Sequence, residues 1–388
     1  MPETARPDPR TRVFHESVTA NVTNENALSR RPRRVRGPAV KERANSSILK
    51  GIGLTAGVLT LASVTLAACA SSTSSGVTIT LYSGQHVQTT EALVASFEKA
   101  NPSIHVVVRS NDEATLDAQI VAEGTRSPAD VFFSENSPAL EYLQQKGLLA
   151  KVNTAVLAKT PSKYSSPRGD WVGVSARVSV IIYNPQLIKR SALPTSVLQL
   201  ASPKYMNRLA FAPGETDFQP IVTSVITTYG TTAATKWLNG MKANATSHLY
   251  PNNETVANDV NRGLVAFGVI DQYYWYRLRA QIGPSNTPSK ITFFSPHDPG
   301  YVLDVSGAGV LKSSAHRAAA QKFLAFLVSA KGQEIIAHSI SFEYPIASGV
   351  TTSQPETPLQ DLQPSPIDVA QLGTGQRAID LLREVQLL

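Results

Sequence analysis

Cysteine is almost absent from this chain of 388 residues, which contains only Cys69. A single cysteine has no partner for an intramolecular disulfide, and it excludes the thiolate clusters that soft metals and structural zinc prefer. The sequence also has no HExxH, no GxSxG and no phosphate-binding loop in its folded part. These absences favour a binding protein over an enzyme.

An excess of charge is also absent from most of the chain. The whole sequence has 36 Lys+Arg and 29 Asp+Glu, with a pI near 9.4. Residues 1–68 hold 11 of the basic and 5 of the acidic residues, so 25 basic and 24 acidic residues remain beyond them. A nearly neutral remainder lacks the basic surface that nucleic acid requires, so we expect no nucleic-acid partner.

One apolar run without charge stands near the N-terminus, at residues 51–68, and a cationic segment precedes it. A positive segment, an apolar segment and small residues before a cut site are typical of an export signal. The run ends in Leu66-Ala67-Ala68-Cys69, and Leu-x-x-Cys is the pattern at which bacterial lipoproteins are cut and acylated. We therefore predict a signal with a basic leader at 1–68, and a lipidated Cys69 with a flexible tether at 69–76.

This leader predicts an exported protein held at the outer face of the cell membrane by the lipid on Cys69. An uncleaved membrane-spanning helix at 51–68 is the alternative, since the run is barely long enough to span a bilayer. Twin-arginine export, suggested by Arg30-Arg31, is another. The sequence leaves open whether translation starts at Met1 or beyond residue 45.

Strand and helix patterns alternate along the rest of the chain. Strands are predicted at 77–83, 104–110, 129–134, 178–184, 209–214 and 264–270, and helices at 87–100, 114–124, 137–146, 232–243 and 315–339. Ser137 and Pro138 suit the N-cap and first position of the third helix. The alternation predicts an α/β protein of two lobes, each a mixed, mostly parallel sheet flanked by helices. We place one lobe at 77–178 plus about 304–354, the other at 179–303 plus about 355–388, with hinge segments crossing between them.

Polar side chains follow several of the predicted strands. They are His86, Glu135, Tyr273 and Tyr274. Ligands of such sheets bind beyond the carboxyl ends of the strands, so these four side chains are candidate site residues. If the strand ends at Ile270, the two tyrosines lie in the first turn of a helix, about 100° apart, and both reach one point.

Two phenols, one carboxylate and one imidazole favour a hard, strongly polarising cation. Phenolate is costly at neutral pH because free tyrosine titrates near pH 10, and only a highly charged ion offsets that cost. Ferric iron fits, because its charge is balanced by Glu135, Tyr273 and Tyr274 with His86 neutral. A stacking platform for a sugar or a polyamine remains open for the tyrosine pair.

Several strings together resemble the ferric-ion-binding proteins of bacterial ABC importers, most clearly over residues 77–350. They are YSGQH (82–86), FFSENSPAL (132–140), WVGVSARVSVIIYN (171–184), DQYYWY (271–276), HDPG (297–300), SGAGVLKSS (306–314) and EYP (343–345). The resemblance implies a two-lobed periplasmic-binding-protein type II fold and a monomer that passes ferric iron to an ABC permease. It also implies that His86, Glu135, Tyr273 and Tyr274 bind the iron.

The resemblance also implies a small anion, often phosphate or carbonate, that completes the iron site. Asn253 matches one asparagine that holds it, but Asn136 stands in place of a glutamine, and the loop at 213–217 reads PGETD. The anion or outer-shell positions are Asn136, Arg177, Glu215, Thr216, Asp217, Asn253 and Asp271. Their extra carboxylates repel an anion, so we expect Asp217 or Glu215 to bind the iron directly or through a water. The sequence leaves open whether an exogenous anion is present.

Two other functions remain open at this point. One is a receptor for a cationic organic solute such as a polyamine, with Glu135, Asp217 and Asp271 as counter-ions. The other is a metal-dependent extracytoplasmic hydrolase. The sequence does not separate ferric iron from another metal, and it does not identify the permease.

Overall fold

The computed structural model of the chain describes residues 76–347, 349–350 and 357–388. The predicted export signal, Cys69 and the tether as far as residue 75 lie outside the described residues. Within the described part, no helix is long and apolar enough to cross a membrane.

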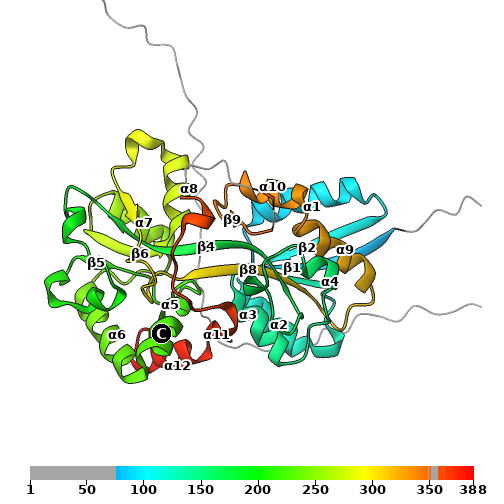
Figure 1. Cartoon of the computed structure of the whole chain (residues 1–388), viewed down its shortest axis with the longest axis horizontal. Coiled ribbons are helices and arrows are strands. Elements are labelled where there is room, and N and C mark those ends of the chain that lie inside the picture. The colour runs from blue at the N-terminus through cyan, green and yellow to red at the C-terminus, as the bar shows by residue number, and fades with distance from the viewer. Residues whose placement is uncertain (1–75, 348, 351–356) are drawn as a thin grey trace, which may run out of the picture. The chain divides into compact units, whose positions relative to one another are not determined.

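The first group of strands is built around β1 (Val77–Ser83), which pairs in parallel with β2 (Ile104–Ser110) on one side and β3 (Val131–Ser134) on the other. The next strand, β8 (Leu303–Val310), is antiparallel to β3 and to β4 (Val172–Tyr183). The short β9 (Tyr344–Pro345) also pairs with β4, antiparallel. Figure 1 shows β4 and β8 as the long strands that run on toward the second group.

The second group lies at the other end of β4. There β4 is antiparallel to β6 (Phe267–Asp271) and to β7 (Lys290–Thr292), and β5 (Leu209–Ala210) is parallel to β6. Along β4 the partner changes from β8 at Val178 to β6 at Ser179. Because β4 pairs with strands of both groups, it connects them without a break. All twelve of its residues are buried.

Helices cover both faces of the first group (Figure 1). On one face are α1 (Val87–Ala100), α9 (Arg317–Leu327) and α10 (Ala330–Ala337), and on the other are α2 (Glu113–Glu123) and α3 (Ser137–Gln145). Successive residues of β3 point to opposite faces. Val131 and Phe133 therefore pack in one core with Phe97 of α1, whereas Phe132 packs in the other core with Leu140 of α3.

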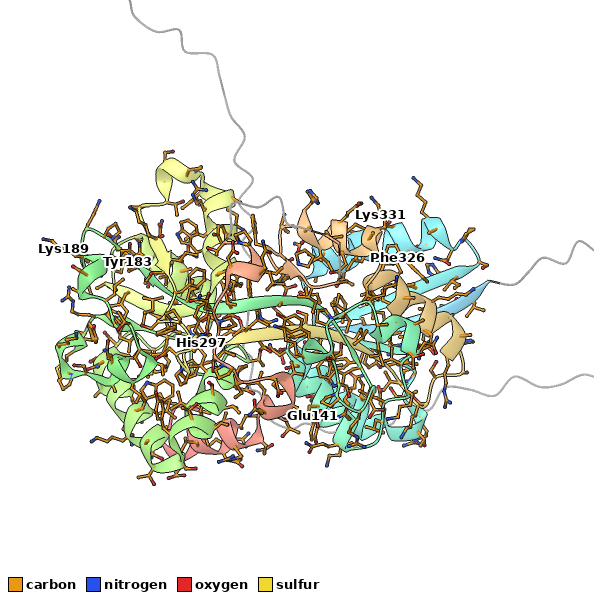
Figure 2. All side chains as sticks on the ribbon, in the orientation of Figure 1. Glu141, Tyr183, Lys189, His297, Phe326 and Lys331 are labelled. Atoms are coloured by element: carbon orange, nitrogen blue, oxygen red, sulfur yellow. The ribbon has the colours of Figure 1, made fainter. Side chains whose placement is uncertain are left out.

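The remaining helices, apart from the short α4 (Thr154–Leu157), belong mainly to the second group. They are α5 (Phe218–Tyr229), α6 (Thr231–Ala245), α7 (Asn253–Asn261), α8 (Gln272–Ile282), α11 (Val369–Leu372) and α12 (Gln376–Glu384). The C-terminal segment is not confined to that group, because α12 packs on α5 and α6 while α11 contacts both α3 and α5. Charged side chains such as Lys189 and Lys331 are exposed at the surface (Figure 2).

The predicted α/β architecture with a mixed sheet is present. β1, α1 and β2 have the predicted bounds, because strict alternation, a helical apolar stripe and the Asn101-Pro102 stop are local signals. The antiparallel share of the sheet is larger than the strand–helix rhythm indicated. It comes from β4 and β8, which pair with strands distant in sequence.

Several predicted bounds are wrong, because the strand predicted at 209–214 is β5, which ends at Ala210, and the strand predicted at 178–184 belongs to β4, which begins at Val172. Three further local predictions are also wrong. Residues 315–339 form two helices, because the hydroxyl of Ser329 accepts a hydrogen bond from Gly332 N at 3.2 Å and caps a new helix. The strand predicted at 264–270 is β6, which begins at Phe267. Asn136, rather than Ser137, is the N-cap of α3, and its side chain makes no capping bond because it is engaged in the site.

Candidate metal site

The four predicted ligand residues lie together, carried by three elements. His86 is the N-cap residue of α1, Glu135 follows β3, and Tyr273 and Tyr274 lie in the first turn of α8. The Nε2 atom of His86 is 3.4 Å from Oε1 of Glu135, and the hydroxyl of Tyr273 donates to the same oxygen at 3.0 Å. The predicted helical start after β6 thus brings both phenols to one side of α8.

His86 is a neutral imidazole with an unused nitrogen. Burial, and then the positive charges of Arg277 and Arg177, lower the pKa of His86 to about 3. Its Nε2 is buried and has no hydrogen-bond partner within the described part of the chain, since the approach to Glu135 lacks hydrogen-bond geometry. A buried nitrogen without a partner is costly, and a metal ion at this point would satisfy it.

The two tyrosines form a stacked pair, with ring centroids 4.0 Å apart and planes at 30°. The Tyr274 hydroxyl donates to Oδ2 of Asp217 at 2.9 Å, and the Tyr273 hydroxyl shares its one proton between Glu135 Oε1 and the same Oδ2, which lies 3.3 Å away. Burial, and then the negative charge of Asp217, raise the pKa of both phenols well above the ordinary value. Without a cation both groups are therefore protonated, and a cation held by both oxygens would displace two protons.

Glu343 lies beside His86 and Glu135, although the sequence did not single it out as a ligand. One ligand atom from each of these three residues lies within 4.8 Å of the other two. The Glu343 carboxylate is already bonded, because Gln85 Nε2, Ser175 Oγ and Ser306 Oγ each donate to it at 2.9 Å. We therefore assign it to the support of the site.

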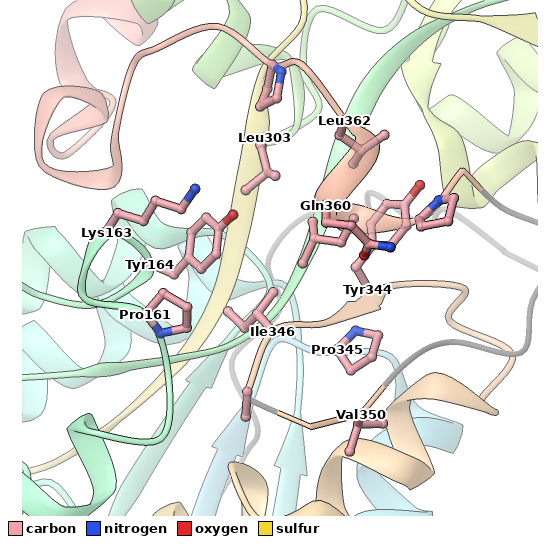
Figure 3. A pocket seen from close by; sticks show the side chains of 14 residues that line it. Pro161, Lys163, Tyr164, Leu303, Tyr344, Pro345, Ile346, Val350, Gln360 and Leu362 are labelled. Carbon is pink, nitrogen blue, oxygen red and sulfur yellow. The ribbon is translucent and has the colours of Figure 1, made fainter.

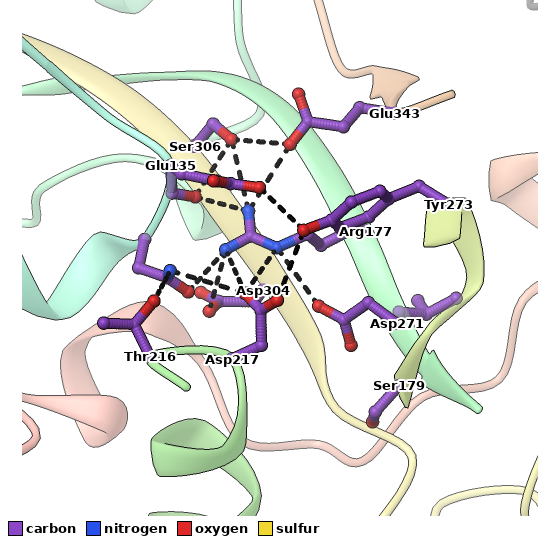
Figure 4. A network of polar contacts seen from close by, with 12 residues as sticks. Glu135, Arg177, Ser179, Thr216, Asp217, Asp271, Tyr273, Asp304, Ser306 and Glu343 are labelled. Atoms are coloured by element: carbon purple, nitrogen blue, oxygen red, sulfur yellow. Dashed lines mark hydrogen bonds and ion pairs between the residues drawn. The ribbon is translucent and has the colours of Figure 1, made fainter. Parts of the chain in front are cut away.

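Arg177 stands at the centre of the acidic groups and is completely buried (Figure 4). Its guanidinium donates to the main-chain oxygen of Glu135 and to the side-chain oxygen of Asn136. It is also ion-paired with four carboxylates, at 3.1 Å to Asp217, 3.1 Å to Asp271, 3.6 Å to Asp304 and 3.5 Å to Glu343.

The charges around Arg177 do not balance. Burial alone would lower the pKa of Arg177, but the surrounding carboxylates, Asp217 first, raise it well above the ordinary value. One cation cannot neutralise four carboxylates. Burial accordingly raises the pKa of Asp271, Asp304 and Glu343 against the opposing effect of Arg177.

Two of the predicted anion or outer-shell residues, Asn136 and Asn253, have side-chain amides that contact the carboxylate of Asp217. Asn136 Nδ2 lies 3.4 Å from Oδ1 of Asp217 and 3.0 Å from the hydroxyl of Thr216, and Asn253 Nδ2 lies 3.4 Å from Oδ2 of Asp217. Of the two carboxylates that the sequence proposed for the iron, only Asp217 contacts the tyrosines. Within the described part of the chain, Glu215 makes no side-chain hydrogen bond to the tyrosines, and burial raises its pKa to about 8.

Sequence reasoning missed three acidic members of this network, Glu113, Asp304 and Glu343. Glu113 accepts from Asn136 Nδ2 at 2.6 Å and is buried, which raises its pKa to about 7. One feature of the sequence could have indicated such a buried acidic residue, namely a charged residue inside an apolar run, as Asp304 is in YVLDVSGAGVL. Its partners come from distant parts of the chain, so that signal could not say which cation compensates it.

A cavity of about 520 Å³ lies elsewhere, between β8, β9 and the loops at 161–164 and 358–364 (Figure 3). Its lining is largely apolar, from residues such as Tyr164, Leu303, Pro345 and Leu362. None of the four predicted ligand residues lines this cavity. The candidate site is instead a group of polar side chains in direct contact with one another.

Comparison with known proteins gives consistent results. Residues 126–365 match the family model described as bacterial extracellular solute-binding protein. The chain is 37% identical to the Fe(3+)-binding periplasmic protein of Serratia marcescens, over 85% of this chain and 96% of that one. It is 33% identical to the major ferric iron-binding protein of Neisseria meningitidis, over 79% and 92%. The crystal structure of iron-bound HitA from Pseudomonas aeruginosa superposes with a TM-score of 0.76, at 38% identity, covering 80% of this chain and 99% of that one.

Proposed function

The chain belongs to the bacterial extracellular solute-binding proteins, and on that premise we propose that its solute is ferric iron, which it delivers to an ABC permease. The expected periplasmic-binding-protein type II fold is confirmed by the match to HitA. A member of this family binds and delivers a solute and is not an enzyme, so the hydrolase alternative is set aside.

The observation that carries the proposal is the donor set itself. Two phenol oxygens, a carboxylate and a neutral imidazole nitrogen without a partner meet at one point. Hard oxygen donors select hard cations, and only a highly charged cation offsets the deprotonation of two buried phenols. With both phenolates and Glu135, the protein supplies three negative charges to an ion of charge +3.

The same geometry argues against a cationic organic solute. A polyamine would need carboxylate oxygens that are open to its ammonium groups, but Asp217 and Asp271 are both buried and are already bonded inside the network, Asp217 to the two tyrosine hydroxyls and Asp271 to Arg177. The tyrosine rings stack on each other and their hydroxyls point at Asp217, so they do not present an open aromatic wall.

Two further parts of the proposal concern the chain around the site. We place the division between the lobes at 178/179 in β4 and near 303/304 in β8, where β4 exchanges strand partners. The lipid anchor is proposed at Cys69, outside the described residues, on the pattern of the leader alone. Both would let a tethered protein close on iron outside the cytoplasm and dock on a permease.

Protein purified without chelators tests the metal directly. Phenolate bound to ferric iron gives a visible charge-transfer band, so the loaded protein should be coloured and contain one iron per chain. The double variant Tyr273→Phe/Tyr274→Phe should lose the band. Tyr276→Phe on the same helix is the matched control and should keep it. Full colour in the double variant would refute the ligand assignment, and full occupancy by another metal would refute the cargo.

A further inference from the structure

A groove of about 580 Å³ lies beside α8, away from the candidate metal site. Residues of α8, of β7 and of the loop that joins them line most of it. Successive helical residues are rotated by about 100°, so the α8 residues that line the groove lie on the side of the helix opposite Tyr273 and Tyr274. The volume is within the range of about 300–1,000 Å³ that is usual for pockets that bind small molecules.

The charges that line this groove are all positive. They belong to Arg190, Arg279 and Lys290, and no carboxylate of the described residues lines the groove. None of these three cations forms a salt bridge within the described part of the chain, whereas Arg277 on the same helix is paired with Glu254 at 3.6 Å. The chain beyond residue 68 is nearly neutral, with 25 basic and 24 acidic residues. The three cations are therefore a local excess of positive charge, which attracts an anion.

Aromatic side chains form the wall beside these cations. They are Trp275 and Tyr276 of α8, and Phe293 directly after β7. The guanidinium of Arg279 lies over the Trp275 ring, 5.6 Å from its centroid, and the indole N–H donates to the main-chain oxygen of Ser289 at 3.1 Å. These two contacts hold the indole in place, although it is partly exposed. A ring that is already held offers a surface on which a planar group can stack with little loss of conformational entropy.

We propose that this groove binds a small organic anion that carries at least two negative charges and a planar unsaturated ring. Three cations without carboxylate partners call for more than one negative charge, and the guanidinium fork suits carboxylate, phosphate or sulfonate oxygens. The aromatic wall calls for the planar ring. A nucleic-acid strand would need a basic surface that continues beyond the groove, and the nearly neutral remainder of the folded chain does not supply it. None of the four candidate metal ligands lines the groove, so the inference does not depend on ferric iron.

The indole of Trp275 reports binding directly. The other two tryptophans, Trp171 and Trp237, are 0% and 2% exposed, so a ligand in the groove changes the fluorescence of Trp275 selectively. The test titrates iron-free protein with ADP, followed by tryptophan fluorescence and by calorimetry, and with naphthalene disulfonate by calorimetry. We expect one ADP per chain with a Kd below about 1 mM. Adenosine lacks the charges and pyrophosphate lacks the ring, so each should bind at least fivefold more weakly.

Variants of the lining residues locate the bound anion. Arg279→Gln/Lys290→Gln should weaken ADP binding at least tenfold. Lys189→Gln is the matched control, because this exposed lysine is next to Arg190 in sequence but does not line the groove, and it should bind within twofold of wild type. Trp275→Phe keeps an aromatic ring and should bind ADP within threefold of wild type by calorimetry, without the fluorescence change.

A further variant separates this groove from the candidate metal site. Tyr273→Phe/Tyr274→Phe alters only the metal site and should bind ADP as wild type does, and thermal unfolding shows whether each variant folds. The inference is overturned if neither ADP nor naphthalene disulfonate binds to wild type, or if the folded Arg279→Gln/Lys290→Gln protein binds ADP as wild type does. Loss of ADP binding in the double tyrosine variant would place the anion in the metal site and would also overturn it. Equal binding of ADP and pyrophosphate would overturn the role of the ring.

Discussion

Replacement of Arg177 by methionine should destabilise the protein more than the loss of any exposed ion pair. The side chain is completely buried, and its guanidinium pairs with Asp217, Asp271, Asp304 and Glu343. Methionine fills similar space without charge, so the change isolates the electrostatic part. Removal of one partner from a buried ion pair leaves an uncompensated charge and typically costs about 3–5 kcal/mol. We expect a loss of that order in the free energy of unfolding of the iron-free protein at pH 8.

The loss should shrink as the pH falls. A carboxyl whose pKa is raised by folding binds more protons in the folded than in the unfolded chain, so its contribution to stability is lost as the pH rises. Burial already raises the pKa of Asp271 and Asp304 while Arg177 opposes that rise. Without Arg177 both pKa values rise further. The variant should therefore lie closer to wild type at pH 5 than at pH 8.

Urea unfolding followed by circular dichroism measures both effects. Arg168→Met is the matched control, because Arg168 is largely exposed and lies 3.7 Å from Asp170. An exposed pair of this kind is worth at most about 1 kcal/mol. The reasoning fails if Arg177→Met unfolds within 1 kcal/mol of wild type at pH 8, or if its deficit is equal at the two pH values.

Three other outcomes are expected. Acid should release the iron, because the buried phenols of Tyr273 and Tyr274 regain their two protons. A pH titration of the charge-transfer band should show the apparent affinity falling by about two orders of magnitude per pH unit, and a flat titration would contradict phenolate ligation. Small-angle scattering should give a smaller radius of gyration with iron than without it, and equal values would contradict closure about the β4 and β8 hinge. Cys69→Ser should move the protein from the membrane fraction to the soluble exported fraction, whereas unchanged fractionation would favour an uncleaved helical anchor.

Local patterns in the sequence were sufficient to predict the strands and helices that carry the candidate ligand residues. The alternation of apolar and polar residues at the start of β1 (VTITL) and the apolar stripe of α1 depend on neighbouring residues alone, so both elements have their predicted bounds. The candidate ligands follow from the same reasoning, because a polar residue just after a buried strand must emerge at the edge of the sheet. His86 and Glu135 were found in this way, and so was the tyrosine pair in the first turn of α8.

The compensation of charge could not be predicted, because it depends on pairings between distant parts of the chain. The sequence placed Arg177 only among the anion or outer-shell positions, whereas in the structure it is ion-paired with four carboxylates. Two of these carboxylates come from distant parts of the chain. Asp304, on β8, is 127 residues beyond Arg177, and Glu343, beside β9, is 166 residues beyond it. Antiparallel pairing of β8 and β9 with β4 brings them together, and the strand–helix rhythm gave no indication of that pairing.

The position of Arg177 connects this charge compensation to the proposed lobe division in β4. It lies on β4 one residue before the strand leaves β8, and two before it meets β6 at Ser179. The guanidinium bonds Asn136, which follows the first strand group, and Asp217, which precedes α5 in the second.

Rotation of one strand group against the other must therefore break bonds to this guanidinium. Each broken bond would expose a buried carboxylate or leave it without its cation, and the cost of an unpaired buried charge opposes that rotation. The contacts of Arg177 thus favour the arrangement in which Glu135 faces Tyr273 at 3.0 Å. The side chain that stabilises an acidic site against its own repulsion also holds together the groups that would bind the iron.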